Sequence, residues 1–431
     1  MKRVLIGALA LALAFAVVGC SKQAKEGAAE TGPTTLSIWS FQELHINYYK
    51  DALERWNSEN PDRQIVLDAQ VYPYDDMHNK LLLSLQSGAG APDLVDIELS
   101  KYPLFLKGTP QLVPMNDYVE PEKSQFIMSR FDIYSKDGKY YGVPFHVGAS
   151  VIYYNTEILE AAGVNYQDIK TWDDYVAAGL KVKAATGKPM VTLESTDVWS
   201  VWPLLAQSGG DFFDASGKCV VDQPQDVKVF QFLYDMVWKS KIAIPSPGGF
   251  HHSEEYYGFM NGGGAASIWM PMWYMGRFTD YMPDLKGKII VAPMPEWPSG
   301  GFKSAGMGGT GTSVTNQCKN VKLAQDFLYF AKMSKEANVQ LWQKLGFDPP
   351  RWDVWDDPRM NEPNKFTEYF ENDNIFGMLL AVKDSMGGVR ITENLPRIHE
   401  QIKTTINPQL ILEGNPDVQG VLATAAADVN R

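Results

Sequence analysis

The chain has 431 residues, of which 45% are hydrophobic and 21% charged, an ordinary composition for a globular protein. This length exceeds what one compact core accommodates and favours two lobes. The net charge is −12 and no run of Lys and Arg could neutralise phosphates, so nucleic acid is not an expected partner. Three cysteines exclude a disulfide framework, and we expect Cys219 and Cys318 to stay unpaired in different lobes.

The first twenty residues have the features of a signal peptide. Lys2 and Arg3 precede an unbroken apolar run, Val4 to Val18, which ends just before Cys20. As a helix this run would be about 22 Å long, shorter than the ~30 Å hydrocarbon core of a bilayer. Removal of residues 1–19 as an export signal is therefore favoured over a permanent membrane span.

The segment 20–35 is expected to be a flexible tether, because Ser21 to Pro33 is small, polar and charged and could not form a packed core. Val17-Val18-Gly19-Cys20 resembles the lipobox of bacterial lipoproteins, although Leu is usual where this chain has Val17. The resemblance implies a lipid on Cys20 that holds the protein to the outer face of the cytoplasmic membrane, or to the periplasmic side of an outer membrane where one exists. The alternative is a conventional signal peptide with an unmodified cysteine.

The next segment has the pattern of alternating strands and helices. Apolar spacing and turn residues predict, in order, a strand over Leu36–Phe41, a helix ending before Asn60-Pro61, a strand over Ile65–Val71, a helix capped by Asp75 or Asp76 and ended by Gly88, and a strand over Leu94–Ile97. Such a β-α-β-α-β unit forms a parallel sheet covered by helices. Ligands of open parallel sheets bind beyond the carboxyl ends of the strands.

Five further segments, in this order along the chain, resemble the extracellular solute-binding proteins of ABC importers, in particular the group that binds sugars and oligosaccharides. They are LQSGAGAPDLVDI (85–97), GVPFHVGASVIYYNTEILEAAGV (142–164), TWDDYVAAGLKVKAATG (171–187), FMNGGGAASIWMPMWY (259–274), and VAPMP with the Gly-rich strand that follows it (291–314). Within the family, YPYDDMHNKLL (72–82) together with SGAGAPDLVDIE (87–98) is similar to the subgroup associated with arabinose-containing oligosaccharides.

The resemblance implies an α/β protein with the two-lobed, type II periplasmic-binding-protein-like fold, in which a sugar is held between the lobes and a hinge closes on it. We place residues 36–144 with about 304–350 in the N-terminal lobe, and 145–303 with about 351–431 in the C-terminal lobe. The chain would cross between lobes near Pro144, within the Gly-rich stretch 300–311, and near 348–351. The same glycines could cradle a phosphate, but the G-x-x-x-x-G-K-[ST] pattern is missing.

Sugar faces pack on aromatic rings, and the chain has 12 tryptophans. Helical spacing assigns Trp56, Trp172 and Trp238 to the core. The remaining candidates for the cleft are Trp39 at a strand end, Trp199 or Trp202 in a loop, and Trp269 and Trp273 in the segment where the family places ligand-facing aromatics. Of these, the pair Trp269 and Trp273 is the preferred prediction.

Sugar hydroxyls require hydrogen-bonding partners at the ring edges. The polar residues expected to supply them are Gln42, Glu43, Asp96, Glu98 and His146. For either acidic residue of the third strand, capping of a neighbouring helix is the structural alternative.

An enzyme is the competing class, since Glu43 and Glu98 could imitate a glycosidase pair. The chain carries neither G-x-S-x-G nor H-E-x-x-H, its six histidines are scattered, and His251-His252 has the pattern of an exposed loop pair. We therefore expect no catalysis, no metal and no cofactor. The expected partners are a sugar or oligosaccharide and the transmembrane subunits of an ABC permease, with the protein itself a monomer. Presentation of the ligand to a membrane sensor is a second alternative.

Overall fold

The computed structural model describes residues 32–431. Its first sheet has six strands. Five follow the spatial order β2 (Ile65–Val71), β1 (Thr34–Ser40), β3 (Leu94–Glu98), β14 (Thr310–Thr315) and β4 (Leu112–Val113), and the sixth, β7 (Val143–Pro144), also pairs with β14. Strands β2, β1 and β3 run parallel, and β14 lies antiparallel to β3. The predicted β-α-β-α-β unit is confirmed, with α1 (Glu43–Glu59) and α2 (Tyr74–Ser87) as its helices.

The helix ends follow the sequence signals with one shift. Asn60 and the left-handed Gly88 end α1 and α2 as expected. However, α2 begins at Tyr74 after Pro73, so Asp75 and Asp76 occupy its first turn and do not cap it. Acidic side chains are favourable in that turn because of the helix dipole.

Helix α12 (Val321–Lys332) packs with α1 against the first sheet, and α13 (Lys335–Leu345) packs on these two helices. This lobe is completed by α3 (Tyr102–Phe105), α4 (Asn116–Val119), α5 (Met128–Asp132), β5 (Ser135–Lys136) and β6 (Lys139–Tyr140). Trp56 is buried beside Phe327 and Phe330, as its helical spacing predicts.

The second sheet is centred on β8 (Ser150–Asn155), with β11 (Ser267–Pro271) and β12 (Ile289–Ala292) antiparallel on either side. Strands β9 (Val191–Leu193) and β10 (Ala243–Pro245) form a separate parallel pair. The surrounding helices are α6 (Thr156–Ala161), α7 (Trp172–Thr186), α8 (Trp202–Ser208), α9 (Pro224–Trp238), α10 (Glu254–Asn261) and α11 (Met275–Tyr281). The chain ends with α14 (Ile375–Leu380), α15 (Leu395–Gln401), two π-helical turns over 402–412, and α16 (Val418–Val429), and the last of these packs on α9.

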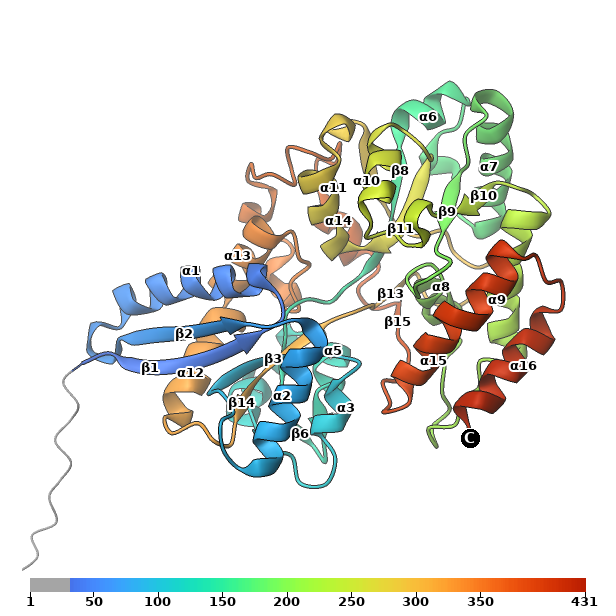
Figure 1. The fold of residues 1–431 in the computed structure, drawn as a ribbon. Coiled ribbons are helices and arrows are strands. Elements are labelled where there is room, and N and C mark those ends of the chain that lie inside the picture. The colour runs from blue at the N-terminus through green and yellow to red at the C-terminus, as the bar shows by residue number, and fades with distance from the viewer. Residues whose placement is uncertain (1–31) are drawn as a thin grey trace, which may run out of the picture.

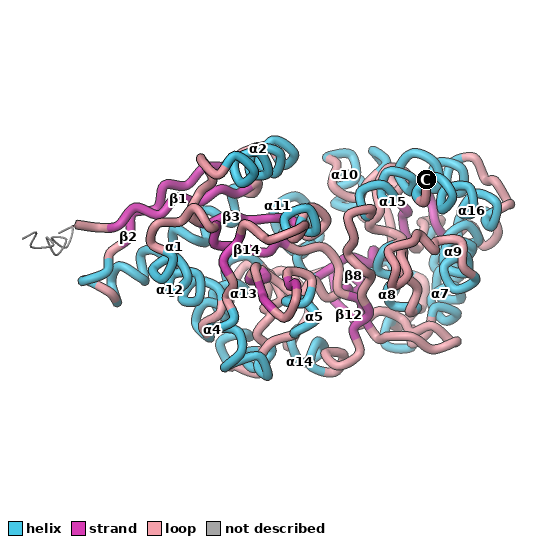
Figure 2. Tube along the Cα trace, turned by 90° about the horizontal axis from the view of Figure 1, so that it is seen from below, coloured by secondary structure: helices cyan, strands magenta, loops and turns pink. Residues whose placement is uncertain are grey.

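Two lobes result, one around each sheet, and narrow connections join them (Figures 1 and 2). The chain passes from β7 to β8 through residues 145–149 and returns from β13 (Ser304–Ala305) to β14 through 306–309, while β13 pairs with β15 (Met386–Gly387). Met307 N–H donates to the carbonyl of Gly148, and Asp348 accepts from the amides of Gly148 and Ala149 at 3.1 and 2.7 Å. The connections are thus hydrogen-bonded to one another at Gly148, whose φ of +70° favours glycine.

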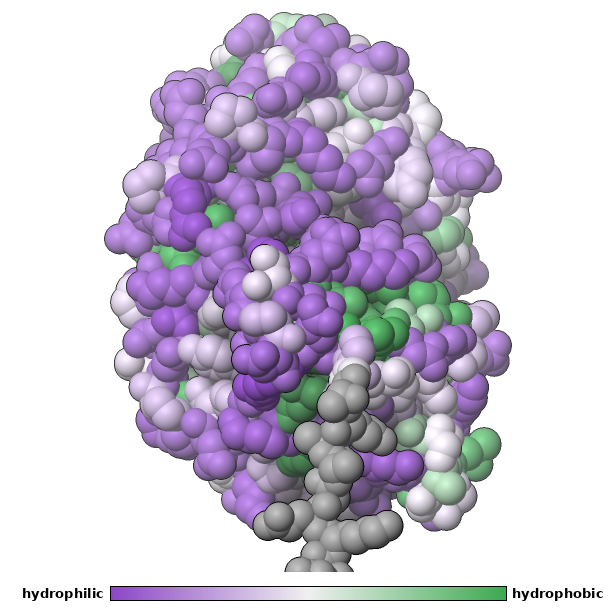
Figure 3. All heavy atoms as spheres, turned by 90° about the vertical axis from the view of Figure 1, so that its left-hand side faces the viewer, coloured by the Kyte–Doolittle hydropathy of each residue, from purple (hydrophilic) through white to green (hydrophobic). Residues whose placement is uncertain are grey.

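The surface of the face at the left of Figure 1 is mostly hydrophilic (Figure 3). Among residues 32–431, no helix is both long and apolar enough to span a bilayer. Cys219 and Cys318 are buried free thiols. The segment expected to be a signal peptide, the expected lipidation site Cys20 and most of the expected tether lie outside the described residues.

Candidate functional site

A cleft of about 840 Å³ lies between the lobes. It is lined by the segments that follow β1 and β3, by both connections between the sheets, by the loops after β9 and β11, and by α15. A second cavity of about 950 Å³ meets it at Trp202 and Gly308. We take the first as the candidate site because aromatic rings and hydrogen-bonding groups from both lobes face it, as sugar recognition requires.

The wall supplied by the second lobe is aromatic. Trp199 lies edge-to-face with Trp273 at 5.4 Å between ring centroids and parallel to Trp202 at 6.1 Å. His252 stacks on Trp273 at 5.8 Å, and Trp273 Nε1 donates to the carbonyl of Met307 at 3.2 Å. All four rings line the cleft, so this wall offers several faces on which C–H groups of a sugar could pack.

The facing wall, supplied by the first lobe, combines rings with polar groups. Phe41 packs edge-to-face on Tyr74 at 5.3 Å, and both line the cleft together with Gln42. Glu98 accepts from Tyr74 Oη at 2.8 Å and from the amide of Ser100 at 2.8 Å. Burial raises the pKa of Glu98 above its usual range.

His78 does not line the cleft but forms hydrogen bonds with two residues of this wall. Its Nδ1 bonds to the carbonyl of Tyr74 at 2.7 Å, and its Nε2 accepts from the amide of Glu98 at 3.1 Å. Only a neutral imidazole can donate through one nitrogen and accept through the other. Burial lowers the pKa of His78 to about 4, in agreement with that neutral form.

Asp96 lies beneath the residues that line the cleft. It is fully buried and does not line the cleft; it accepts from His45 Nδ1 at 3.0 Å, and from Ser40, Tyr49 and Thr312 hydroxyls at 2.8 to 3.1 Å. Burial alone would raise the pKa of Asp96, but the hydrogen bond from His45 and the nearby positive charges outweigh it and lower the pKa. The carboxylate therefore fixes the ring of His45, which lines the cleft.

His146 lines the cleft from the first connection, edge-to-face with Phe347 at 5.0 Å. Burial, with nearby Arg130 next, lowers the pKa of His146 well below its usual value, so the ring is neutral. Its Nδ1 has no hydrogen-bond partner among residues 32–431. Because this nitrogen is buried, a sugar hydroxyl would exchange a hydrogen bond with the other ring nitrogen, Nε2.

Some of the residues predicted to bind the ligand therefore line the cleft, and others do not. Gln42, Glu98, His146, Trp202 and Trp273 line the cleft. Trp269, Trp39, Asp96 and Glu43 do not line it.

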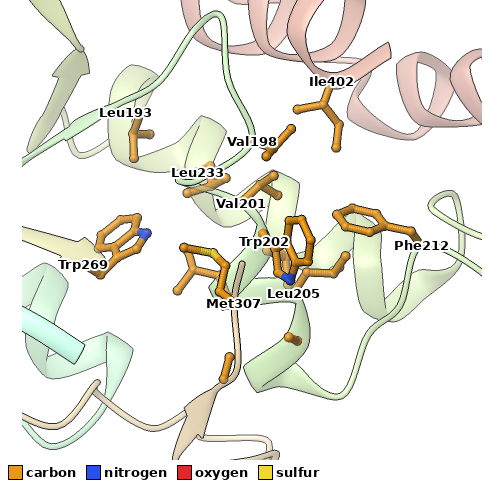
Figure 4. Close-up of a cluster of buried hydrophobic side chains, with 14 of the residues drawn as sticks. Leu193, Val198, Val201, Trp202, Leu205, Phe212, Leu233, Trp269, Met307 and Ile402 are labelled. Carbon is orange, nitrogen blue, oxygen red and sulfur yellow. The ribbon is translucent and has the colours of Figure 1, made fainter. Parts of the chain in front are cut away.

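The preferred pair of tryptophans requires a correction. Trp269 is 1% exposed and packs on Trp172 and Tyr175, so it is a core residue. Its Nε1 donates to the carbonyl of Ser200 at 3.0 Å, which supports the loop that carries Trp199. Figure 4 shows Trp269 on the side of Met307 opposite to Trp202, inside the hydrophobic cluster.

Two other assignments also change. Trp39 is buried against Tyr72, with Lys80 Nζ 4.4 Å from its ring centroid. Glu43 is exposed in the first turn of α1, so of the two carboxylates that could imitate a glycosidase pair only Glu98 lines the cleft.

Sequence reasoning missed several residues that line the cleft, including Phe41, His45, Tyr74 and His252. The expectation of an exposed histidine pair was wrong, because His251 is 1% exposed and His252 stacks on Trp273. Adjacent side chains point in different directions, so one ring entered the core and the other the cleft. Within the described part of the chain, no group of three His, Cys, Asp or Glu side chains could hold a metal ion.

An α/β fold with an aromatic and polar cleft between two lobes defines a hinged ligand-binding protein. The family model of the bacterial extracellular solute-binding proteins matches residues 43–337, and the chain belongs to this family. An arabinooligosaccharide-binding protein of Halalkalibacterium halodurans is 52% identical over 375 residues, covering 87% of this chain and 84% of the relative. One of Bacillus subtilis is 46% identical over 400 residues, covering 92% of each.

Solved structures show the same fold. The sugar-binding protein MalE of Xanthomonas citri superposes with a TM-score of 0.77 at 18% identity, covering 92% of this chain and 96% of that one. The cyclic α-maltosyl-1,6-maltose-binding protein of Arthrobacter globiformis gives a TM-score of 0.75 at 20% identity, with 93% and 98% covered. The predicted two-lobed type II architecture is confirmed.

Proposed function

We propose that this protein is the substrate-binding component of a carbohydrate ABC importer and that it captures arabino-oligosaccharides in the cleft between its lobes. The observation that carries the proposal is the pairing of an aromatic wall, Trp199, Trp202, His252 and Trp273, with a polar wall across one cleft. The names of the two relatives above support the choice of sugar.

Capture would use each wall for a different part of the sugar. Ring faces pack on Trp199 and Trp273, while hydroxyls exchange hydrogen bonds with Gln42, Glu98 and His146. Contacts made with both walls at once exist only in the closed form, and a ligand shifts a conformational equilibrium only by such a difference in affinity. Micromolar capture corresponds to about −8.2 kcal/mol.

The remaining assignments complete the proposal. The lobes comprise 36–144 with about 304–350, and 145–303 with about 351–431. The closed monomer delivers its sugar to the permease subunits. A lipid on Cys20 holds the protein to the outer face of the cytoplasmic membrane, or to the periplasmic side of an outer membrane where one exists. The protein binds and releases the sugar without changing it chemically, because the sugar is the transported solute.

Calorimetric titration of the chain from Ser21 onward tests the function. The panel contains arabino-, xylo-, malto- and cello-oligosaccharides and their monosaccharides. We expect micromolar or tighter binding of arabino-oligosaccharides and at least tenfold weaker binding of the others. Silence across the panel would contradict a sugar-binding role, and new reducing ends after incubation would reveal an enzyme.

A further inference from the structure

Glu194, the residue after β9, is a buried carboxylate with an unusual set of partners. It is 1% exposed, and its Oε2 accepts from the amides of Trp199 at 2.7 Å and Ser200 at 3.2 Å. Its Oε1 accepts from the amide of His251 at 2.9 Å. No Lys or Arg among residues 32–431 forms an ion pair with it. Three backbone donors thus satisfy a carboxylate that burial would otherwise disfavour.

These amides belong to two separate segments that both reach the cleft. Trp199 lines the cleft directly, and His251 precedes His252, which also lines it. Both rings contact Trp273, at 5.4 Å and 5.8 Å. The carboxylate therefore bonds to both loops that flank the central ring of the aromatic wall, in addition to the Ser195 and Thr196 amides that donate to the carbonyl of Gly249 at 2.9 and 3.1 Å. Figure 4 shows the first of these loops running from Leu193 over to Val198 and Val201.

We propose that Glu194 is a positioning residue for sugar binding: by accepting from Trp199, Ser200 and His251 it fixes the spacing of the Trp199 and His252 rings around Trp273. This inference rests on the proposed function. Glu194 does not line the cleft, so it acts on the ligand only through the rings that it holds.

The chemistry of the site makes the carboxylate hard to replace. All three contacts are donors, and a carboxylate is a pure acceptor with two oxygens. A glutamine offers one oxygen and directs an NH₂ group at a backbone N–H. Burial, with the charge of Asp197 next, raises the pKa of Glu194. The amide bonds oppose this shift by favouring the ionised form.

If Glu194 only stabilised the fold, replacing it would lower the melting temperature without weakening sugar binding. A matched control variant distinguishes that role from a positioning role. Asp226, in α9, is likewise 2% exposed, accepts from a backbone amide (that of Asp211, at 3.3 Å), and has a pKa raised to about 7 by burial. It lies in the same lobe and does not line the cleft. Glu194→Gln and Asp226→Asn therefore replace buried carboxyl groups at different distances from the aromatic wall.

The experiment measures, for wild type and both variants, the affinity for an arabino-oligosaccharide by calorimetry, the melting temperature, and the near-ultraviolet circular dichroism of the unliganded protein. The dichroism band that disappears in the variant Trp199→Phe arises from the parallel Trp199 and Trp202 rings. This band can be measured without any sugar. We expect Glu194→Gln to weaken binding at least tenfold and to reduce that band. Asp226→Asn should lower the melting temperature similarly, yet keep the affinity within twofold and the band intact.

Each outcome is decisive. Affinity within twofold of wild type and an unchanged band in Glu194→Gln would overturn the inference. Should Glu194→Gln fail to fold, Glu194→Asp keeps both oxygens at shorter reach and is expected to show a smaller loss of the same kind. Should wild type bind no sugar, the proposed function fails, while the band still decides whether Glu194 positions the rings.

Discussion

The two walls of the cleft are built by different means. In the first lobe, regular strands and helices bring polar side chains to the ends of parallel strands, and buried groups such as Asp96 and His78 fix the residues that face the cleft. In the second lobe, an irregular loop after β9 carries the ring of Trp199, and the 3-10 turn Met272–Tyr274 after β11 carries the ring of Trp273. In this cleft, buried side chains hold the polar groups directly in a hydrogen-bonded frame, whereas the ring of Trp199 is held through the backbone of its loop.

The largest expected effect separates the two tryptophans of the IWMPMW segment. Trp269→Ala should lower the free energy of unfolding by about 3–5 kcal/mol, because it empties a core position. Trp273→Ala should weaken sugar binding more than tenfold while the melting temperature of the unliganded protein stays nearly unchanged. Calorimetry and thermal unfolding of both variants measure the two effects. An equal fall in melting temperature for both would mean that Trp273 belongs to the core.

The next effect concerns the frame of the polar wall and its dependence on pH. The folded pKa of His78, about 4, lies below its unfolded value of about 6.5. The unfolded chain therefore binds more protons in this window, and stability is present above pH 6.5 and lost as the pH falls toward 4. The difference corresponds to about 3 kcal/mol.

His78→Gln removes this titration and serves as the comparison. The variant should be less stable than wild type at pH 7, but its free energy of unfolding should change less between pH 7 and pH 4.5. Urea unfolding at the two pH values measures this. Parallel losses in both proteins would show that His78 is not held neutral in the fold.

In each wall the sequence predicted some residues correctly and misplaced others, and the reason lies in where strands end. Trp39, Asp96 and Trp269 each lie inside a strand, so helices or the other side of the sheet cover them. Gln42 and Trp273 lie just beyond strand ends, and Glu98 is the last residue of β3. Apolar alternation locates a strand but leaves its last residue uncertain by one or two positions. A shift of one or two positions decides whether a side chain lies in the core or in the cleft.

The missed histidine of the aromatic wall has a different explanation. Trp199 and His252 belong to segments that are far apart in sequence. These segments meet through Glu194, through the two rings themselves at 6.1 Å between centroids, and through the Ser195 and Thr196 amides, which donate to the carbonyl of Gly249. No local periodicity marks a loop whose conformation is set by such distant partners, so the sequence could not place His252 in the cleft.

The smallest expected effect is a difference in sugar affinity between two variants of the first lobe. Glu98→Gln keeps one acceptor oxygen but loses the charge that receives the Tyr74 hydroxyl and the Ser100 amide, so affinity should fall by roughly tenfold, or about 1.4 kcal/mol. Glu43→Gln alters an exposed side chain outside the cleft and should leave affinity within twofold. Calorimetry of the two variants measures the contrast. Equal losses would place Glu43 in contact with the sugar after closure, and the polar wall would then extend onto the first turn of α1.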